Sequence, residues 1–297
     1  MLIEDFIIHV FCDVEQSYQE VVGGIRLRGR GFEPKLSDSE VITMEIVGEF
    51  LGIDTDKGIW KYFRTHWKEW FPQLGSRANF VKQSANLWAV KQRILQRLSM
   101  SLGGFSDPIH IVDGFPMPVC LFARAPRSQC FEDSATFGYC ATKKETYYGF
   151  QGVVMINFEG VITGFTVVPA NVDEREALWD VVNSIYGLLI GDKGYLRPIL
   201  KQELLEQQGI DLQTPVRRNM PDTRPKAFVK SLMSARRLVE TVIGQLAGQF
   251  HIEKVRARDL WHLTNRFVRK LLSHTMGVFL NRSLGREPLQ FEGLITA

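Results

Sequence analysis

Residues 187–213 read GLLIGDKGYLRPILKQELLEQQGIDLQ and contain, in succession, an apolar run, a helical pattern and a second apolar run. The first run, at residues 187–190, is followed by Asp192, and Pro198 and Gly209 mark the beginning and the end of the expected helix. A strand, a helix and a strand in this order are typical of α/β proteins, in which helices cover a sheet. We therefore predict an α/β fold around this stretch.

The segments on both sides of this stretch continue the alternation of strands and helices. We expect further strands at residues 109–112, 147–156, 161–168 and 210–216, and further helices at residues 174–185, 231–250 and 260–281. The second and third strands are separated by a short Phe-Glu-Gly turn and form a hairpin. The order strand, hairpin, helix, strand, helix, strand, helix predicts a layered α/β arrangement.

The N-terminal third differs because its apolar residues recur at helical spacing. Ser37 and Glu40 form a capping box, the signature of a helix N-terminus. Another helix is expected at residues 79–100, and the glycine-containing segment 99–104 is the best candidate for a linker. The predicted domains are a helical domain at residues 1–104 and an α/β domain at residues 105–297 that includes the C-terminal helices.

Composition places the chain among ordinary globular proteins, with 45% hydrophobic and 23% charged residues. No apolar stretch approaches the length of about 18 residues that a membrane span needs, so we expect no membrane segment. The chain begins with acidic rather than basic residues, which argues against a secretory signal and favours a cytoplasmic protein. No Walker-type phosphate-binding loop is found, so we expect no nucleotide cofactor.

The charges are distributed unevenly along the chain. Residues 1–192 contain 18 Lys and Arg against 24 Asp and Glu, whereas residues 193–297 contain 18 against 9. A basic C-terminal third indicates either a surface that binds a polyanion or a set of solvated helix faces. The candidate contacts are Lys143, Lys144, Arg217, Arg218, Arg256, Arg258, Arg266, Arg269 and Lys270.

Two acidic residues follow apolar strands. Asp113 comes after the strand at residues 109–112, and Asp192 comes after the strand at residues 187–190. Ligand sites in open α/β sheets form at the carboxyl ends of strands, where two carboxylates repel each other unless a cation lies between them. Magnesium is commonly held by one or two carboxylates together with substrate phosphates. The alternative is that either residue is an ordinary surface loop aspartate.

A third acidic residue, Glu240, lies on the expected long helix, four residues after Arg236 and on the same face. An exposed helical ion pair is the simpler interpretation of this spacing. Combined with Asp113 and Asp192, however, Glu240 would complete a set of three carboxylates. Such a set can hold two divalent ions for phosphoryl transfer, with the guanidinium neutralising a phosphate.

Several motifs along the chain occur together in one known family. They are Leu-Ser-Asp-Ser-Glu at residues 36–40, Val-Asp-Gly-Phe-Pro at 112–116, Tyr-Tyr-Gly-Phe at 147–150, Val-Pro-Ala-Asn at 168–171, Gly-Asp-Lys-Gly-Tyr at 191–195 and Arg-Leu-Val-Glu-Thr at 237–241. In these motifs and in their order the chain resembles the DDE transposases of bacterial insertion sequences, specifically the insertion-sequence 982 family. That family is related to the group whose second motif is Gly-Asp-Lys-Gly-Tyr.

The resemblance implies a ribonuclease H-like core, a mixed sheet flanked by helices, behind a helical N-terminal domain that helps to bind transposon ends. Asp113, Asp192 and Glu240 would be the catalytic acids and would hold two Mg²⁺ (or Mn²⁺) ions. The partners implied are double-stranded DNA, as terminal inverted repeats and as target, and a second copy of the chain in the DNA complex. The protein would then be associated with the nucleoid. The DNA-binding residues expected are Lys193, Tyr195, Arg236, Arg237, Lys143, Lys144, Arg217 and Arg218.

Two other functions stay open at this point. Met233 and Ala247 stand where the related group often has Tyr and Lys, and Gln151 begins a segment where a Lys-x-His pattern is common. A catalytically inactive or domesticated DNA-binding protein is therefore one alternative. A ribonuclease H-like nuclease that cuts DNA without strand transfer is the other.

Overall fold

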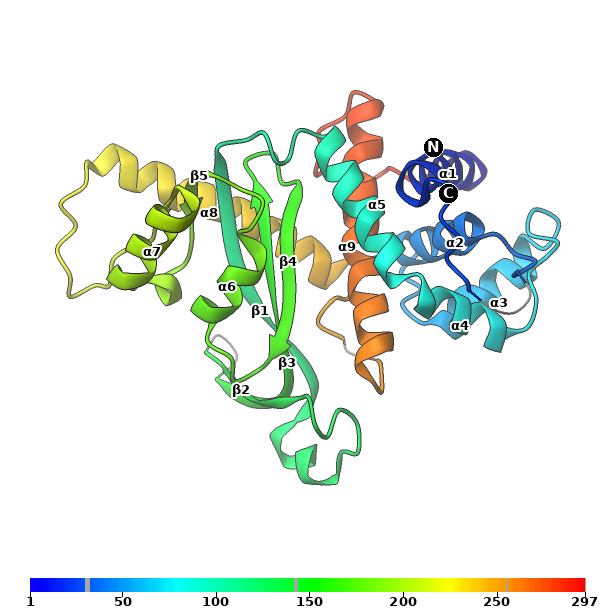
Figure 1. Ribbon diagram of the computed structural model, residues 1–297, viewed down its shortest axis with the longest axis horizontal. Helices are drawn as coiled ribbons and strands as arrows, with labels where there is room; N and C mark the ends of the chain where they lie inside the picture. The colour runs from blue at the N-terminus through cyan, green and yellow to red at the C-terminus, as the bar shows by residue number, and fades with distance from the viewer. Residues whose placement is uncertain (30–32, 142–143, 255, 297) are drawn as a thin grey trace. The chain divides into compact units, whose positions relative to one another are not determined.

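The computed structural model describes residues 1–29, 33–141, 144–254 and 256–296 (Figure 1). The chain divides into two compact units. The first contains Met1–Leu98, Leu246–Ile252 and Arg256–Ala297, and the second contains Ser99–Gln245 and Glu253–Val255. The first boundary lies near the predicted one, but the last helix belongs with the N-terminal helices and not with the α/β unit.

The first unit consists of helices, as predicted for the N-terminal third. Their bounds are α1 Ile3–Val22, α2 Asp38–Phe50, α3 Asp56–His66, α4 Arg77–Asn86, α5 Trp88–Ser101, whose end passes into the second unit, and α9 Leu260–Ser283. The capping box at Ser37 and Glu40 is confirmed, since each side chain accepts a hydrogen bond from the other residue's backbone N–H. The single helix predicted at residues 79–100 is two helices, because the chain turns at Leu87.

Buried ion pairs join α9 to α2 and to the start of α3. Arg269 of α9 is fully buried, and its guanidinium lies 2.6 Å from Glu49 and 2.7 Å from Asp56. Lys270 is 2.8 Å from the other carboxylate oxygen of Glu49. Arg269 and Lys270 are therefore neither DNA contacts nor solvated surface charges, the two roles considered from the sequence.

The second unit is built on one mixed sheet. Its strands are β1 Ile109–Leu121, β2 Thr136–Cys140, β3 Glu145–Asn157, β4 Ile162–Pro169, β5 Gly187–Ile190 and β6 Ile210–Gln213. The order is β2-β3-β1-β5-β6, with β4 also paired to β3. β5 and β6 run parallel to β1, whereas β3 is antiparallel to β1, β2 and β4. This topology is consistent with a ribonuclease H-like core.

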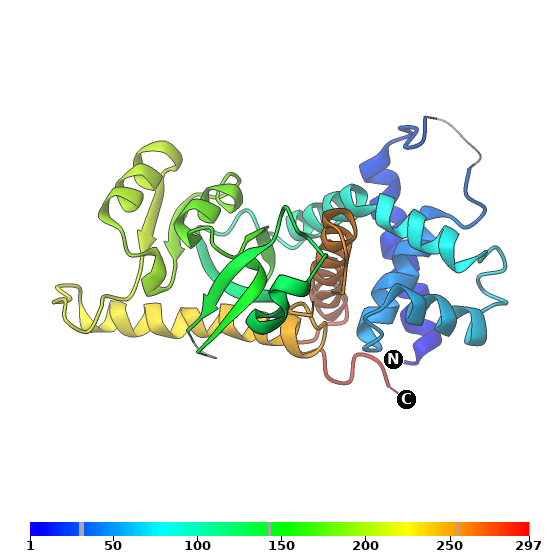
Figure 2. The same cartoon turned by 90° about the horizontal axis from the view of Figure 1, so that it is seen from below.

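Helices cover both faces of this sheet. They are α6 Glu174–Val181, α7 Pro198–Gln208 and α8 Lys226–Gly248, with short 3-10 turns η1 Phe122–Arg127 and η2 Lys193–Tyr195. Figure 2 shows α8 along one face of the sheet, with α6 and α7 on the other. On the α6 and α7 face, Val112 and Val153 join Leu178 and Leu204 in one buried cluster. None of the described helices is long and apolar enough to cross a membrane.

Strand β1 is much longer than the four residues predicted. It continues through Pro116 and Pro118 to Leu121 because β3 pairs with it over its whole length, while β5 pairs only with residues 109–111. Beyond Ile111, the edge of β1 that faces away from β3 has no paired strand among the described residues, and an unpaired strand edge tolerates proline. Asp113 therefore lies within a strand, just past the end of its parallel pairing, and not at the strand's end.

Replacing Arg269 should destabilise the first unit strongly. Arg269→Met leaves Glu49 and Asp56 buried without their shared cation, which typically costs about 3–5 kcal/mol. Chemical denaturation followed by circular dichroism measures the change in the free energy of unfolding. Arg258→Met, at an exposed position of the same unit, is the matched control and should stay within about 0.5 kcal/mol. An equally stable Arg269→Met variant would contradict a structural role for these ion pairs.

Candidate active site

The three acidic residues singled out in the sequence meet around one guanidinium group. The Nη2 atom of Arg236 lies 3.7 Å from a carboxylate oxygen of Asp113, 3.5 Å from one of Asp192 and 3.5 Å from one of Glu240. These acids come from β1, from the turn after β5 and from α8. Residues that are distant along the chain therefore form one cluster within the second unit.

Strand pairing brings the first two acids together. Ile111 of β1 is in register with Ile190 of the parallel strand β5, and Asp113 and Asp192 each follow two residues later. Val112 packs into the core on the α6 and α7 face, so Asp113 points to the opposite face, which α8 covers. Asp192 lies in the turn two residues after β5 and accepts a hydrogen bond from the N–H of Lys193, which holds its carboxylate at the same edge of the sheet.

Helix α8 supplies the other two groups of the cluster. Val239 and Val242 are fully buried and anchor the helix to the α/β unit. Arg236 and Glu240 lie one helical turn apart, on the face of α8 next to the one that carries these valines. Both side chains therefore reach the edge of the sheet where Asp113 and Asp192 lie. The side chain of Arg236 is only 12% exposed, whereas that of Glu240 is 54% exposed. The cluster is thus closed on the Arg236 side and open to solvent on the Glu240 side.

The negative charges in this cluster exceed the positive charge. Burial raises the pKa of Asp113 to about 6, although the N–H of Gly114 and the guanidinium of Arg236 both favour the ionised carboxylate. The charges of Asp192 and Glu240 raise this pKa further. One guanidinium therefore does not compensate three carboxylates, and the cluster attracts additional cations.

The residues present fit divalent cations. Carboxylate oxygens are the ligands that Mg²⁺ and Mn²⁺ prefer, and Asp113, Asp192 and Glu240 supply them around a common point. As placed, no three acidic, histidine or cysteine side chains in the described part of the chain are close enough to hold one ion. Arg236 lies between the three carboxylates, so binding of an ion there requires this guanidinium to withdraw.

Most of the predicted DNA-binding residues are exposed. Lys193 lies beside Asp192, Arg237 donates a hydrogen bond of 3.0 Å to Ser234, and Lys144 lies just before β3. Arg217 and Arg218 are exposed in the segment between β6 and α8. Lys143 lies outside the described residues.

Tyr195 has a different place from the one expected. It is fully buried, and its ring packs against Gly191 within the core shared by β1, α6 and α7. Its ring is therefore not presented to a DNA backbone in this structure. The Gly-Asp-Lys-Gly-Tyr motif suggested that Tyr195 lies in an exposed loop. The residue follows β5 in the sequence, and its ring fills part of the buried core beside that strand.

Two polar residues near the acids were not identified from the sequence. Glu174, at the start of α6, accepts a hydrogen bond of 2.7 Å from the amide of Gln151 on β3. Burial raises the pKa of Glu174, and the charges of Asp113 and Asp192 raise it further. A signal was available, because an acidic residue at the N-terminus of a helix that follows a strand is a common site residue.

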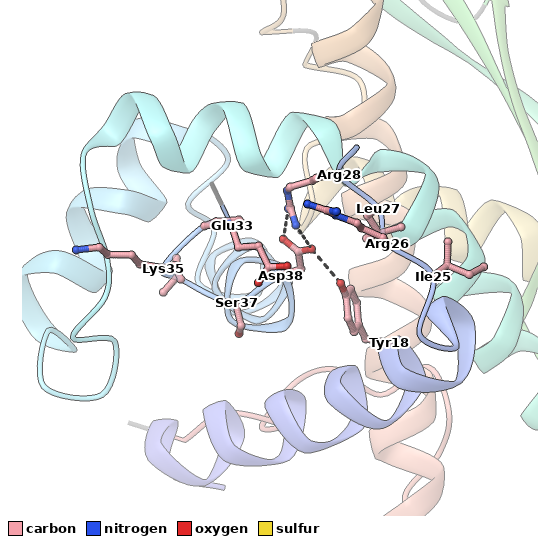
Figure 3. A pocket seen from close by; sticks show the side chains of 11 residues that line it. Tyr18, Ile25, Arg26, Leu27, Arg28, Glu33, Lys35, Ser37 and Asp38 are labelled. Atoms are coloured by element: carbon pink, nitrogen blue, oxygen red, sulfur yellow. Dashed lines mark hydrogen bonds and ion pairs between the residues drawn. The ribbon is translucent and has the colours of Figure 1, made fainter. Parts of the chain in front are cut away.

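The first unit contains a separate pocket, shown in Figure 3. Asp38 lies in it and accepts hydrogen bonds of 2.9 Å from Tyr18, 2.9 Å from Arg28 and 2.8 Å from Gln83. Its carboxylate is thus already occupied by protein donors. The pocket contains none of the acidic residues described above, and we assign the chemistry to the cluster around Arg236.

The raised pKa of Asp113 predicts a pH-dependent effect on stability in the absence of metal. Wild-type protein loses stability as the pH rises from about 4 to about 6, because the folded state holds the proton more tightly than the unfolded state. Asp113→Asn does not ionise and should be more stable than wild type at pH 8 by up to about 3 kcal/mol, with little difference at pH 4.

Thermal denaturation in EDTA at the two pH values measures this difference. Asp133→Asn, at an exposed position of the same unit, is the matched control and should show no such pH dependence. A pH-independent effect of Asp113→Asn would mean that Asp113 is not held in a desolvated, negatively charged cluster.

Comparison with known proteins identifies the family of the chain. The family model described as the transposase DDE domain matches residues 103–260, more than half of the 297-residue chain. The matched region contains Asp113, Asp192, Arg236 and Glu240. A search of curated proteins found no match. The chain belongs to the transposase DDE domain family.

Proposed function

We propose that this protein is the transposase of a bacterial insertion sequence, of the insertion-sequence 982 family. It would cleave DNA at the terminal inverted repeats of the element and join the resulting 3′ ends to target DNA. The observation that supports this most directly is the position of Arg236, whose Nη2 atom lies within 3.7 Å of all three acidic residues. The family match supports the same reaction class.

Asp113, Asp192 and Glu240 would hold two Mg²⁺ or Mn²⁺ ions. When bound, such ions would activate the attacking oxygen and stabilise the leaving oxygen of a phosphodiester. The parallel pairing of β1 with β5 keeps Asp113 and Asp192 at a fixed separation, and α8 brings Glu240 to them. These three residues would therefore form a site with little reorganisation of the backbone.

Arg236 would change its partner when DNA binds, from the three acidic residues to a phosphate of the substrate. Without DNA, its guanidinium offsets part of the negative charge of the three acidic residues. On binding of cations and DNA it would turn to a phosphate of the substrate, for which a guanidinium is well suited. The exposed residues Lys193 and Arg237 lie next to Asp192 and Arg236 in the sequence and would bind the neighbouring DNA backbone.

Recognition of the DNA ends would involve other parts of the chain. The exposed basic residues Lys144, Arg217 and Arg218, together with Lys143, would contact DNA around the site, and the helical unit would help to bind the terminal repeats. Two ends must be brought together for transposition, so we expect a homodimer in the DNA complex. The protein would act in the cytoplasm at the nucleoid and would need neither a membrane nor a nucleotide cofactor.

Cleavage of a labelled terminal-repeat duplex in Mg²⁺ or Mn²⁺ tests this function. Wild-type protein should nick the duplex at the repeat and join precleaved ends to a target plasmid. Asp113→Asn, Asp192→Asn and Glu240→Gln should each lower cleavage at least about a hundredfold, as loss of a group that stabilises the transition state does. Their binding to the duplex should persist.

The exposed Asp133→Asn variant is the matched control and should cleave like wild type. Cleavage without any joined product would indicate a nuclease that lacks strand transfer. Binding that falls with salt, with no cleavage in either metal, would indicate a DNA-binding protein without catalysis. Equal cleavage by wild type and Asp113→Asn would show that Asp113 is not catalytic and would contradict the assignment of the three acidic residues as the catalytic site.

A further inference from the structure

Glu174 approaches the acidic cluster from the α6 face of the sheet. An added Cβ at Gly114 would lie 3.1 Å from its Oε1 atom, and an added Cβ at Gly194 would lie 2.8 Å from its Oε2 atom. Gly114 follows Asp113 directly, and Gly194 is two residues after Asp192. The carboxylate of Glu174 therefore lies against the backbone that carries two of the three acidic residues, in space that the missing side chains of these glycines provide.

No cation neutralises Glu174 within the described ranges of the chain. Its hydrogen-bond partner is the neutral amide of Gln151, at 2.7 Å. The neighbouring Arg175 pairs with Asp173 instead. A half-buried carboxylate next to two others is costly unless it is protonated or a cation is present. Glu174 therefore adds to the excess of negative charge that Arg236 leaves uncompensated.

A buried polar group marks the inner side of this acidic region. Tyr195 is fully buried, and its hydroxyl oxygen has no hydrogen-bond partner among the described residues. Its ring packs against Gly191, the residue before Asp192. Burial raises the pKa of this hydroxyl well above its ordinary value, and among the charges Glu174 raises it most, ahead of Asp113. A buried hydroxyl that lacks a hydrogen-bond partner carries an energetic cost, and here it lies in the electrostatic field of the acidic residues.

We propose that Glu174 is a fourth acidic group of the cation site, and that its negative charge raises the affinity of Asp113, Asp192 and Glu240 for divalent cations. This inference rests on the proposed function, which places the cations at those three residues. Four carboxylates and one guanidinium give a net charge of −3, which matches two divalent cations together with one phosphate group of DNA. Gly114 and Gly194 leave open the space in which the Glu174 carboxylate lies, because a Cβ at either position would approach one of its oxygens to 3.1 Å or less.

Binding of Mn²⁺ alone to the full-length protein, followed by electron paramagnetic resonance of the free ion, tests this proposal. Glu174→Gln removes the charge but keeps an oxygen that accepts the hydrogen bond from Gln151, so the packing is preserved. We expect this variant to bind Mn²⁺ at least about tenfold more weakly than wild type, as loss of a supporting group does at other metal sites. Glu176→Gln, an exposed position in the same turn of α6, is the matched control and should leave the affinity unchanged.

Gly194→Ala gives an independent measure, because the added methyl group displaces the Glu174 carboxylate without changing any charge. It should also weaken Mn²⁺ binding. In EDTA, Glu174→Gln should unfold at a higher temperature than wild type, since it relieves repulsion with Asp113 and Asp192. A purely structural Glu174 would lower that temperature and leave Mn²⁺ affinity unchanged.

Asp113→Asn separates failure of this inference from failure of the proposed function. If Asp113→Asn weakens Mn²⁺ binding while Glu174→Gln and Gly194→Ala bind like wild type, Glu174 is not part of the site and only this proposal is overturned. If wild-type protein binds no Mn²⁺, or Asp113→Asn binds as well as wild type, the cation site itself is wrong and both proposals are overturned.

Discussion

Repulsion among carboxylates gathered at one edge of a sheet is the constraint on which the second unit depends. Parallel pairing of β1 with β5 places the backbone of Asp113 and that of Asp192 near each other, two residues beyond the last paired residues. Buried valines of α8 hold Arg236 against them, so the guanidinium offsets part of the repulsion. The fold therefore maintains a negatively charged site at the expense of its own stability, as active sites often do.

The two units use buried charges in different ways. In the helical unit, Glu45, Glu49 and Asp56 face Lys91, Arg269 and Lys270, so that acidic and basic groups are balanced within a closed core. In the α/β unit, the acidic residues outnumber the single guanidinium, and Glu240 is open to solvent. Balanced ion pairs hold helices together, whereas an excess of one sign at an open edge attracts an ion of the opposite sign. This contrast is a physical reason to assign chemistry to the second cluster and not to the first.

Local patterns predicted much of this structure. The helix from Pro198 to Gln208 and its left-handed Gly209 cap follow from turn chemistry, and the hairpin of β3 and β4 follows from the short turn between two apolar runs. The proximity of Asp113 and Asp192 could be inferred because each follows an apolar run in the sequence, although β1 continues past Asp113. Interactions between distant segments could not be inferred. The burial of Arg269 depends on α2, and that of Tyr195 depends on α6 and α7; no local signal distinguishes either from an exposed residue. Glu174 had a local signal, its place at the start of a helix that follows a strand, but its position beside Gly114 and Gly194 depends on packing between distant segments.

The most direct test of the central claim is anomalous diffraction from crystals of the protein grown with terminal-repeat DNA and Mn²⁺. If the three acidic residues form the catalytic site, anomalous peaks will lie among Asp113, Asp192 and Glu240, and Arg236 will have moved from between them to a DNA phosphate. Manganese bound elsewhere, with Arg236 still paired to all three carboxylates while DNA is bound, would contradict it.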